Sequence, residues 1–139
     1  QRKIGAAIEE MGVPMERWLL HKGTAETAAD ELQGKGIRFA FIDGDHGHPN
    51  PSLDLLRLLP VLCPGATVVL HDINLPAMQA HKKLKSSNAG AKILFDQWPW
   101  MRVQSSAGNR NIGMIRVPYL EQAAYTLGRI ARMPEHDPA

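Results

Sequence analysis

Two short apolar runs, "IRFAFI" at Ile37–Ile42 and "ATVVL" at residues 66–70, constrain the fold of this chain most strongly. Both are rich in β-branched or aromatic residues and lack the polar–apolar alternation of a strand with one wet face. Between them, leucines recur at helical spacing up to a Pro-Gly pair: Leu53, Leu56, Leu59 and Leu62. A strand–helix–strand unit of this kind predicts two parallel strands buried in a sheet.

The rest of the chain extends this unit into a longer alternation. Helical spacing or helix-forming composition predicts helices at residues 4–11, 24–32, 76–87 and 119–131. Further apolar runs predict strands at residues 18–20, 91–95 and Ile112–Val117, with a polar loop at residues 105–110. The alternation predicts an α/β fold, a doubly wound and mostly parallel sheet with helices on both faces. Since no helix separates the last two strands, we expect an antiparallel strand at one edge.

Length and composition limit the kinds of partner. We expect one α/β domain over residues 1–133 and a flexible, proline-containing tail at residues 134–139. A formal net charge of +2 is too small to indicate nucleic-acid binding. The single cysteine, Cys63, cannot form an internal disulfide. No apolar run approaches the roughly eighteen residues that span a bilayer, so we expect a cytoplasmic protein with no membrane partner.

A polar cluster follows each of the two apolar runs. "DGDH" at residues 43–46 comes after the first run, and "HD" at residues 71–72 comes after the second. Ligands bind parallel sheets at the carboxyl ends of the strands, and those ends meet at one edge. One such cluster often only caps the next helix. Two clusters at the same edge predict a shared functional pocket.

This part of the chain resembles the class I S-adenosylmethionine-dependent methyltransferases, in the branch whose fourth strand ends in "IDGDH" and whose fifth ends in "HD". "HKGTAETAADEL" is similar to the third strand and following helix of that family, and "NIGMIRVP" to its antiparallel seventh strand. The resemblance implies a Rossmann-like methyltransferase fold. It also implies S-adenosylmethionine as cofactor and methyl transfer to oxygen of a small hydroxylated or sugar-like acceptor.

The resemblance also implies cofactor contacts. Gly23, Thr24 and Ala25 would line the adenine pocket through their backbone amides. Asp43 would hold the methionine end of the cofactor, and Gly44 would let the backbone approach it closely.

Metal and catalytic roles fall on the same two clusters. Asp43 and Asp72, with His71 beside them, match or flank the metal-binding positions of the metal-dependent members, which implies Mg²⁺ or another divalent cation. Ile73 stands where those enzymes carry Asn or Asp, so the oxygen set is incomplete. A histidine can accept the proton of the acceptor hydroxyl, which makes His46 and His71 the candidate bases, with Asp43 beside them in the catalytic set.

Three other polar or aromatic positions stand near these motifs. His48 is expected to be a loop residue, next to Pro49. Trp98 and Trp100, in "DQWPWMR", are candidates for the wall of an acceptor pocket, or for a cover over the edge of the sheet.

The glycine-rich turn with which the class I family binds its cofactor has no counterpart here. We therefore expect homo-oligomerisation or pairing with a missing N-terminal segment, and weak cofactor binding by these 139 residues alone. Two other functions stay open. One is a catalytically silent oligomerisation module, and the other is a metal-dependent hydrolase that uses the same acids and histidines, including Asp45.

Overall fold

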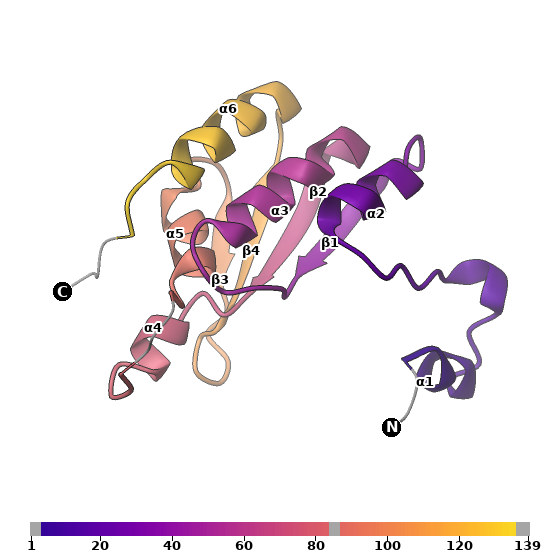
Figure 1. The fold of residues 1–139 in the computed structure, drawn as a ribbon, viewed down its shortest axis with the longest axis horizontal. Coiled ribbons are helices and arrows are strands. Elements are labelled where there is room, and N and C mark those ends of the chain that lie inside the picture. Colours follow the sequence, from indigo (N-terminus) through magenta and orange to yellow (C-terminus); the bar gives the residue numbers. More distant parts are fainter. Residues whose placement is uncertain (1–3, 84–86, 136–139) are drawn as a thin grey trace.

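The computed structural model describes residues 4–83 and 87–135, which form a four-stranded sheet with helices packed against it (Figure 1). The strand order across the sheet is β1-β2-β4-β3. The strands are β1 (Ile37–Ile42), β2 (Leu62–His71), β3 (Arg102–Gln104) and β4 (Ile112–Val117). The α/β fold class is confirmed.

Most of the helices lie along one layer of the molecule. The helices of the described residues are α1 (Ile4–Glu10), η1 (Met15–Arg17), α2 (Ala25–Glu31), α3 (Asn50–Leu58), η2 (Leu59–Val61), α4 (Leu75–Met78), α5 (Gly90–Gln97) and α6 (Leu120–Ala131). Helix α3 lies between α2 and α6 and contacts α5, while α1 stands apart from the sheet (Figure 1). The helices predicted around α2, α3 and α6 are confirmed.

The strand pairing decides where the candidate residues meet. β1 and β2 are parallel, with Ile42 opposite Leu70, so their carboxyl ends lie side by side. β4 pairs antiparallel with β2, and β3 pairs antiparallel with β4. The strand predicted at Ile112–Val117 is therefore antiparallel as expected, but it lies between β2 and β3, and β3 forms that edge of the described sheet.

Alternate residues of β2 and β4 form the core beneath the helices. Val68, Leu70, Ile115 and Val117 are fully buried and belong to one cluster with the apolar residues of α3, α5 and α6. Their burial follows from the strand period, which turns every second side chain toward the helix layer.

The opposite face of β1 differs from the expectation of a strand covered on both faces. Phe39 is 60% exposed and Phe41 is 52% exposed. β1 is an edge strand of the described sheet. Helix α3 and the helices that contact it pack on the face of the sheet that carries Ile42, and Phe39 and Phe41 lie on the other face. The apolar run thus predicted the strand correctly, but not its exposure.

The strand predicted at residues 18–20 is wrong. These residues follow η1 as extended chain outside the sheet, and Leu19 and Leu20 are exposed. The ring of Trp18 packs instead against α1, so closely that a Cβ on Gly5 would lie 2.8 Å from it. A three-residue apolar run does not form a strand without a neighbouring strand to receive its backbone hydrogen bonds.

Two predictions after β2 are also wrong. Residues 91–95 belong to helix α5, in which Ala91, Leu94 and Phe95 are buried at the i, i+3, i+4 spacing of one helix face. The helix predicted at residues 76–87 is confined to the short α4, and residues 84–86 lie outside the described part of the chain.

Candidate active site

The carboxyl ends of β1 and β2 bring the two predicted clusters together. Asp43 follows Ile42 at the end of β1, and His71 is the last residue of β2. Nδ1 of His71 lies 3.0 Å from Oδ1 of Asp43. The predicted proximity of the two clusters is therefore confirmed.

Asp72 is the buried centre of this group, with only 7% of its surface exposed. Its backbone has a φ of 67°, in the left-handed region that Asp adopts more readily than most residues. Oδ1 accepts a hydrogen bond of 2.8 Å from the side-chain amide of Asn111. Oδ2 lies 2.9 Å from Nδ1 of His46 and 3.2 Å from Nδ1 of His71. A buried carboxylate with three partners holds both imidazoles in place.

His46 comes from the loop between β1 and α3. The side chain of His46 is 51% exposed in its pair with Asp72. The loop turns at Gly47, whose amide donates to Oδ1 of Asp45 at 2.8 Å. Asp45 thus serves its own loop rather than the group around Asp72.

Three of these residues form a candidate cation site. Nδ1 of His71 and one carboxylate oxygen from each of Asp43 and Asp72 lie within 4.8 Å of one another. Two carboxylates and an imidazole suit Mn²⁺, Fe²⁺ or Zn²⁺ better than Mg²⁺, which prefers oxygen ligands. The adjoining cavity of about 10 Å³ has room for one water or ion, so a larger ligand would contact Asp43 and His46 from their exposed side.

The comparison with protein families identifies the fold. A family model described as a methyltransferase domain matches residues 1–73, more than half of the 139-residue chain. The chain belongs to this methyltransferase-domain family.

Two solved structures share the fold of this methyltransferase domain. A putative O-methyltransferase from Klebsiella pneumoniae superposes with a TM-score of 0.58 at 17% identity, over 83% of this chain and 56% of that one. Cofactor-bound Rv0187 from MTB superposes with a TM-score of 0.60 at 17% identity, over 81% of this chain and 54% of that one. The domain thus spans about half the length of either structure. No curated protein matches its sequence.

The expected adenine-binding residues lie at the start of α2 in the methyltransferase domain. Thr24 caps the helix: its hydroxyl accepts from the amide of Thr27 at 3.3 Å, and the Thr27 hydroxyl accepts from the amide of Thr24 at 3.0 Å. A Cβ on Gly23 would lie 2.6 Å from His21 Nε2, so the backbone passes close to that ring. Gly23, Thr24 and Ala25 therefore sit on a different element from Asp43 and the residues around it.

Asn74 does not replace the oxygen ligand that is missing at Ile73. Its side-chain amide donates to the carbonyl of Asn109 at 2.6 Å, away from Asp72, and Ile73 itself is buried. The first coordination shell that the described residues offer thus stays at three ligands.

Trp98 is a core residue rather than a wall of the site. Trp98 is 2% exposed and belongs to the core, where its indole N–H donates to the carbonyl of Arg116 at 3.0 Å. Trp100 packs edge-on against it with 5.1 Å between ring centroids. Trp98 is thus a core residue, which matches neither interpretation of these rings, and for Trp100 both interpretations stay predictions.

A carboxylate next to the site has a perturbed pKa. Burial raises the pKa of Asp54 above its ordinary value, and the charge of Asp45 raises it further, whereas the guanidinium of Arg57 lowers it. Oδ1 of Asp54 lies 3.5 Å from Nη1 of Arg57. Its other oxygen, Oδ2, would be 3.4 Å from a Cβ on Gly44, so this partly buried carboxylate adjoins the end of β1.

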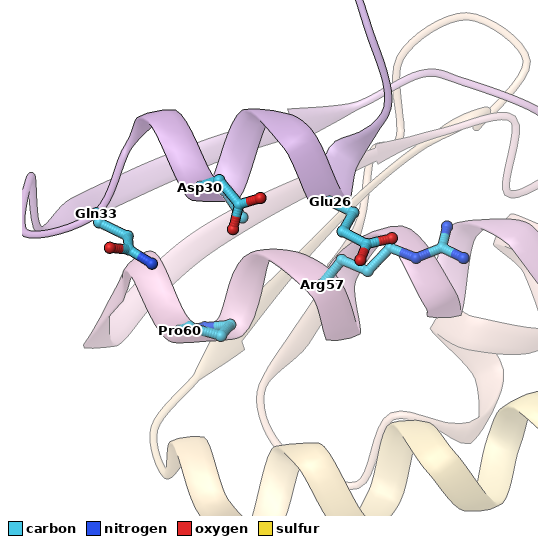
Figure 2. A pocket seen from close by; sticks show the side chains of 6 residues that line it. Glu26, Asp30, Gln33, Arg57 and Pro60 are labelled. Carbon is cyan, nitrogen blue, oxygen red and sulfur yellow. The ribbon is translucent and has the colours of Figure 1, made fainter.

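A larger cavity lies between the helices and not at the acid–histidine group. About 380 Å³ opens between α2 and the α3–η2 segment (Figure 2). Glu26 and Asp30 line it from α2, and Arg57 and Pro60 from the opposite side. Its lining offers no paired histidine and carboxylate, unlike the group at the ends of β1 and β2.

Sequence reasoning missed Asn111, which is 6% exposed and holds Asp72. Its Oδ1 accepts from the amide of Asn74 at 2.9 Å, so it joins the turn after β2 to the start of β4. The only signal in the sequence is a polar residue directly before the apolar strand "IGMIRV".

Proposed function

We propose that this chain is an S-adenosylmethionine-dependent methyltransferase that methylates an oxygen of a small hydroxylated or sugar-like acceptor. Membership of the methyltransferase-domain family supports the reaction class. The observation that carries the proposal is the pairing of His46 with the buried Asp72, 2.9 Å apart at the carboxyl edge of two parallel strands. This pairing resembles the base–carboxylate arrangement that proton transfer requires.

His46 is the proposed proton acceptor. Because a carboxylate only accepts hydrogen bonds, Nδ1 of neutral His46 carries the hydrogen toward Asp72, and Nε2 keeps its lone pair. The acceptor hydroxyl would transfer its proton to Nε2 as its oxygen bonds to the methyl carbon, while the bond from that carbon to the sulfonium sulfur breaks and leaves its electron pair on sulfur. Asp72 stabilises the resulting imidazolium. His71 lies beside this pair, between Asp43 and Asp72.

The cofactor supplies an electrophilic methyl group on a sulfonium sulfur. Asp43 and Gly44, both exposed at the end of β1, are the proposed contacts for its amino-acid end. Gly23, Thr24 and Ala25, at the start of α2, are the proposed contacts for its adenine.

A divalent cation would be held by Asp43, His71 and Asp72, whose donor atoms already lie within 4.8 Å of one another. Bound there, a cation lowers the pKa of a coordinated hydroxyl. Asn111 serves as the outer partner that orients Asp72.

Cofactor binding is tested by titrating the ¹⁵N-labelled protein with S-adenosylhomocysteine up to millimolar concentration. NMR chemical shifts report weak as well as tight binding. We expect shifts at the amides of Gly44, Thr24 and Ala25, and none at amides of α6 such as that of Tyr125, whose side chain is exposed. No shift at any of the three amides at millimolar ligand would contradict the proposal.

Catalysis is tested by transfer of a labelled methyl group to a panel of catechols, phenols and sugars. We expect His46→Gln to lower the rate about a hundredfold or more, within the range for loss of a general base. Glu121→Gln, on the first turn of α6, is the matched control and should retain the rate. Equal rates for His46→Gln and wild type would remove His46 from the mechanism.

A further inference from the structure

The loop that carries His46, residues 45–49, is anchored by segments far away in the sequence. The carbonyl of His46 accepts from the amide of Gly90, the first residue of α5, at 2.8 Å. The amide of His48 donates to the hydroxyl of Ser87 at 2.9 Å. Both contacts come from the chain that enters α5, so two hydrogen bonds tie this loop to the start of α5.

The second anchor is the segment after α6, residues 133–135, which we call the C-terminal strap. Nε2 of His48 donates to the carbonyl of Met133 at 2.7 Å. The hydroxyl of Ser87 donates to Oε1 of Glu135 at 2.6 Å. Met133 and Pro134 also form one wall of a cavity of about 160 Å³ against α5. The strap is therefore tied to the His46 loop directly through His48 and indirectly through Ser87.

The His48 ring is fixed by this contact. A carbonyl oxygen only accepts hydrogen bonds, so Nε2 must carry the hydrogen. Nδ1 is buried and has no hydrogen-bond partner among the described residues. Because a buried nitrogen without a partner costs free energy, the bond from Nε2 to Met133 is what compensates for burying this ring.

We propose that the C-terminal strap positions His46 over Asp72, with His48 and Ser87 as the positioning residues. This proposal rests on the function proposed above for His46. The side chain of His46 is half exposed and pairs with Asp72, so the path of its loop sets where its ring lies. A shift of about 1 Å in a reacting group costs up to about a hundredfold in rate.

Two truncations test the strap directly. One variant ends at Arg132 and lacks the strap, and the matched control ends at Glu135 and keeps it. We expect the variant that ends at Arg132 to exchange the amide hydrogens of residues 46–48 about tenfold faster, the factor that follows from losing about one hydrogen bond. Amides of β2 and β4 should exchange equally in both. Equal exchange of residues 46–48 in the two truncations would overturn the proposal.

Substitutions at His48 separate positioning from simple stability. His48→Gln keeps a side-chain N–H donor near the position of Nε2, whereas His48→Ala has none. We expect His48→Ala to lower kcat for methyl transfer about ten- to a hundredfold with an unchanged KM for the cofactor. For His48→Gln, the loss in log kcat relative to wild type should be at most half the loss in His48→Ala. If both variants retain the wild-type kcat, His48 does not position His46.

The outcomes also separate this proposal from the proposed function. If wild type transfers no methyl group but loss of the strap accelerates exchange at residues 46–48, the strap still holds the loop and the methyltransferase assignment fails. If wild type is active and the truncation at Arg132 changes neither exchange nor kcat, the strap proposal fails alone. Should that truncation not fold, Ser87→Ala and His48→Ala decide by the same exchange measurement.

Discussion

The side-chain amide of Asn111 donates a hydrogen bond of 2.8 Å to Oδ1 of Asp72. This bond joins the residue before β4 to the residue after β2, two strands that pair antiparallel in the sheet. With Oδ1 engaged, Oδ2 of Asp72 is the oxygen that faces His46 and His71. Asn111 thus determines which carboxylate oxygen is available to the histidines.

Removing this amide should destabilise the protein. Asn111→Ala leaves the amide of Asn74 and Oδ1 of Asp72 without their partner in a buried place, at a cost of about 1–3 kcal/mol. Urea unfolding measures the loss. Asn88→Ala is the control, because Asn88 is only partly buried and its bond of 3.0 Å goes to the side chain of Gln79. An equal loss of unfolding free energy in both variants would mean that the buried hydrogen bonds of Asn111 stabilise the protein no more than the partly buried bond of Asn88.

Neutralising Asp72 should abolish catalysis while preserving the fold. Asp72→Asn keeps the volume of the side chain, and Asn also tolerates the left-handed backbone found here. The amide no longer stabilises a protonated His46, so we expect the rate of methyl transfer to fall about a hundredfold or more. Asp30→Asn, an exposed change on α2, should leave the rate unaltered. Retained activity in Asp72→Asn would show that the pair with His46 is not used.

The partly buried carboxylate of Asp54 should make stability depend on pH. Burial raises its pKa in the folded protein, so the folded state holds the proton at pH values where the unfolded state has lost it. The contribution of Asp54 to stability is therefore largest below its unfolded pKa and falls as the pH rises through the folded pKa. As the pH rises from 3 to 7, we expect the unfolding free energy of Asp54→Asn to increase relative to that of wild type, as measured by urea unfolding.

The opposing charge of Arg57 provides the control for that measurement. Arg57 lowers the pKa of Asp54, so Arg57→Gln should raise it further and steepen the loss of stability with pH. If the difference in unfolding free energy between Asp54→Asn and wild type does not change with pH, the pKa of Asp54 is not raised in the folded state.

Two glycine substitutions in helices should have opposite effects. A Cβ on Gly90 would lie 2.6 Å from the carbonyl oxygen of His46 and from Cδ of Pro51, so Gly90→Ala must displace the loop and should cost about 1–3 kcal/mol. Gly128, inside α6, has nothing within 4 Å of such a Cβ. Gly128→Ala should therefore stabilise by about 0.5–1 kcal/mol through helix propensity. Thermal melts of the two variants check both signs, and a stabilised Gly90→Ala would contradict the packing of α5 on the loop.

The elements that the sequence predicted correctly are those with a strong local signal. Ile37–Ile42 and Ile112–Val117 are strands as predicted, since continuous β-branched and aromatic runs pack well in a sheet. Thr24 begins α2 because its side chain satisfies a backbone amide within its own turn. The meeting of the two polar clusters was also predictable, because parallel strands that are joined by a helix end at the same edge.

Packing overrode the local signal in α5 and around Trp18. Phe95 lies against the position where Gly113 of β4 has no side chain, so close that a Cβ there would be 2.7 Å from its ring. In helix α5, Phe95 lies on the buried face that makes this contact. The run "AKILF" alone does not distinguish a helix from a strand, because a short apolar run is typical of both. Residues 18–20 show the converse, an apolar run left outside the sheet.

The sequence by itself determined the strand–helix–strand unit and the edge at which Asp43 and Asp72 lie, because hydrophobic periodicity and chain connectivity act over short distances along the chain. Only the tertiary structure decided that Asn111 orients Asp72 and that Met133 and Glu135 hold the loop of His46. These contacts join segments remote in sequence, and each depends on where the packed core brings the backbone, which no local pattern records.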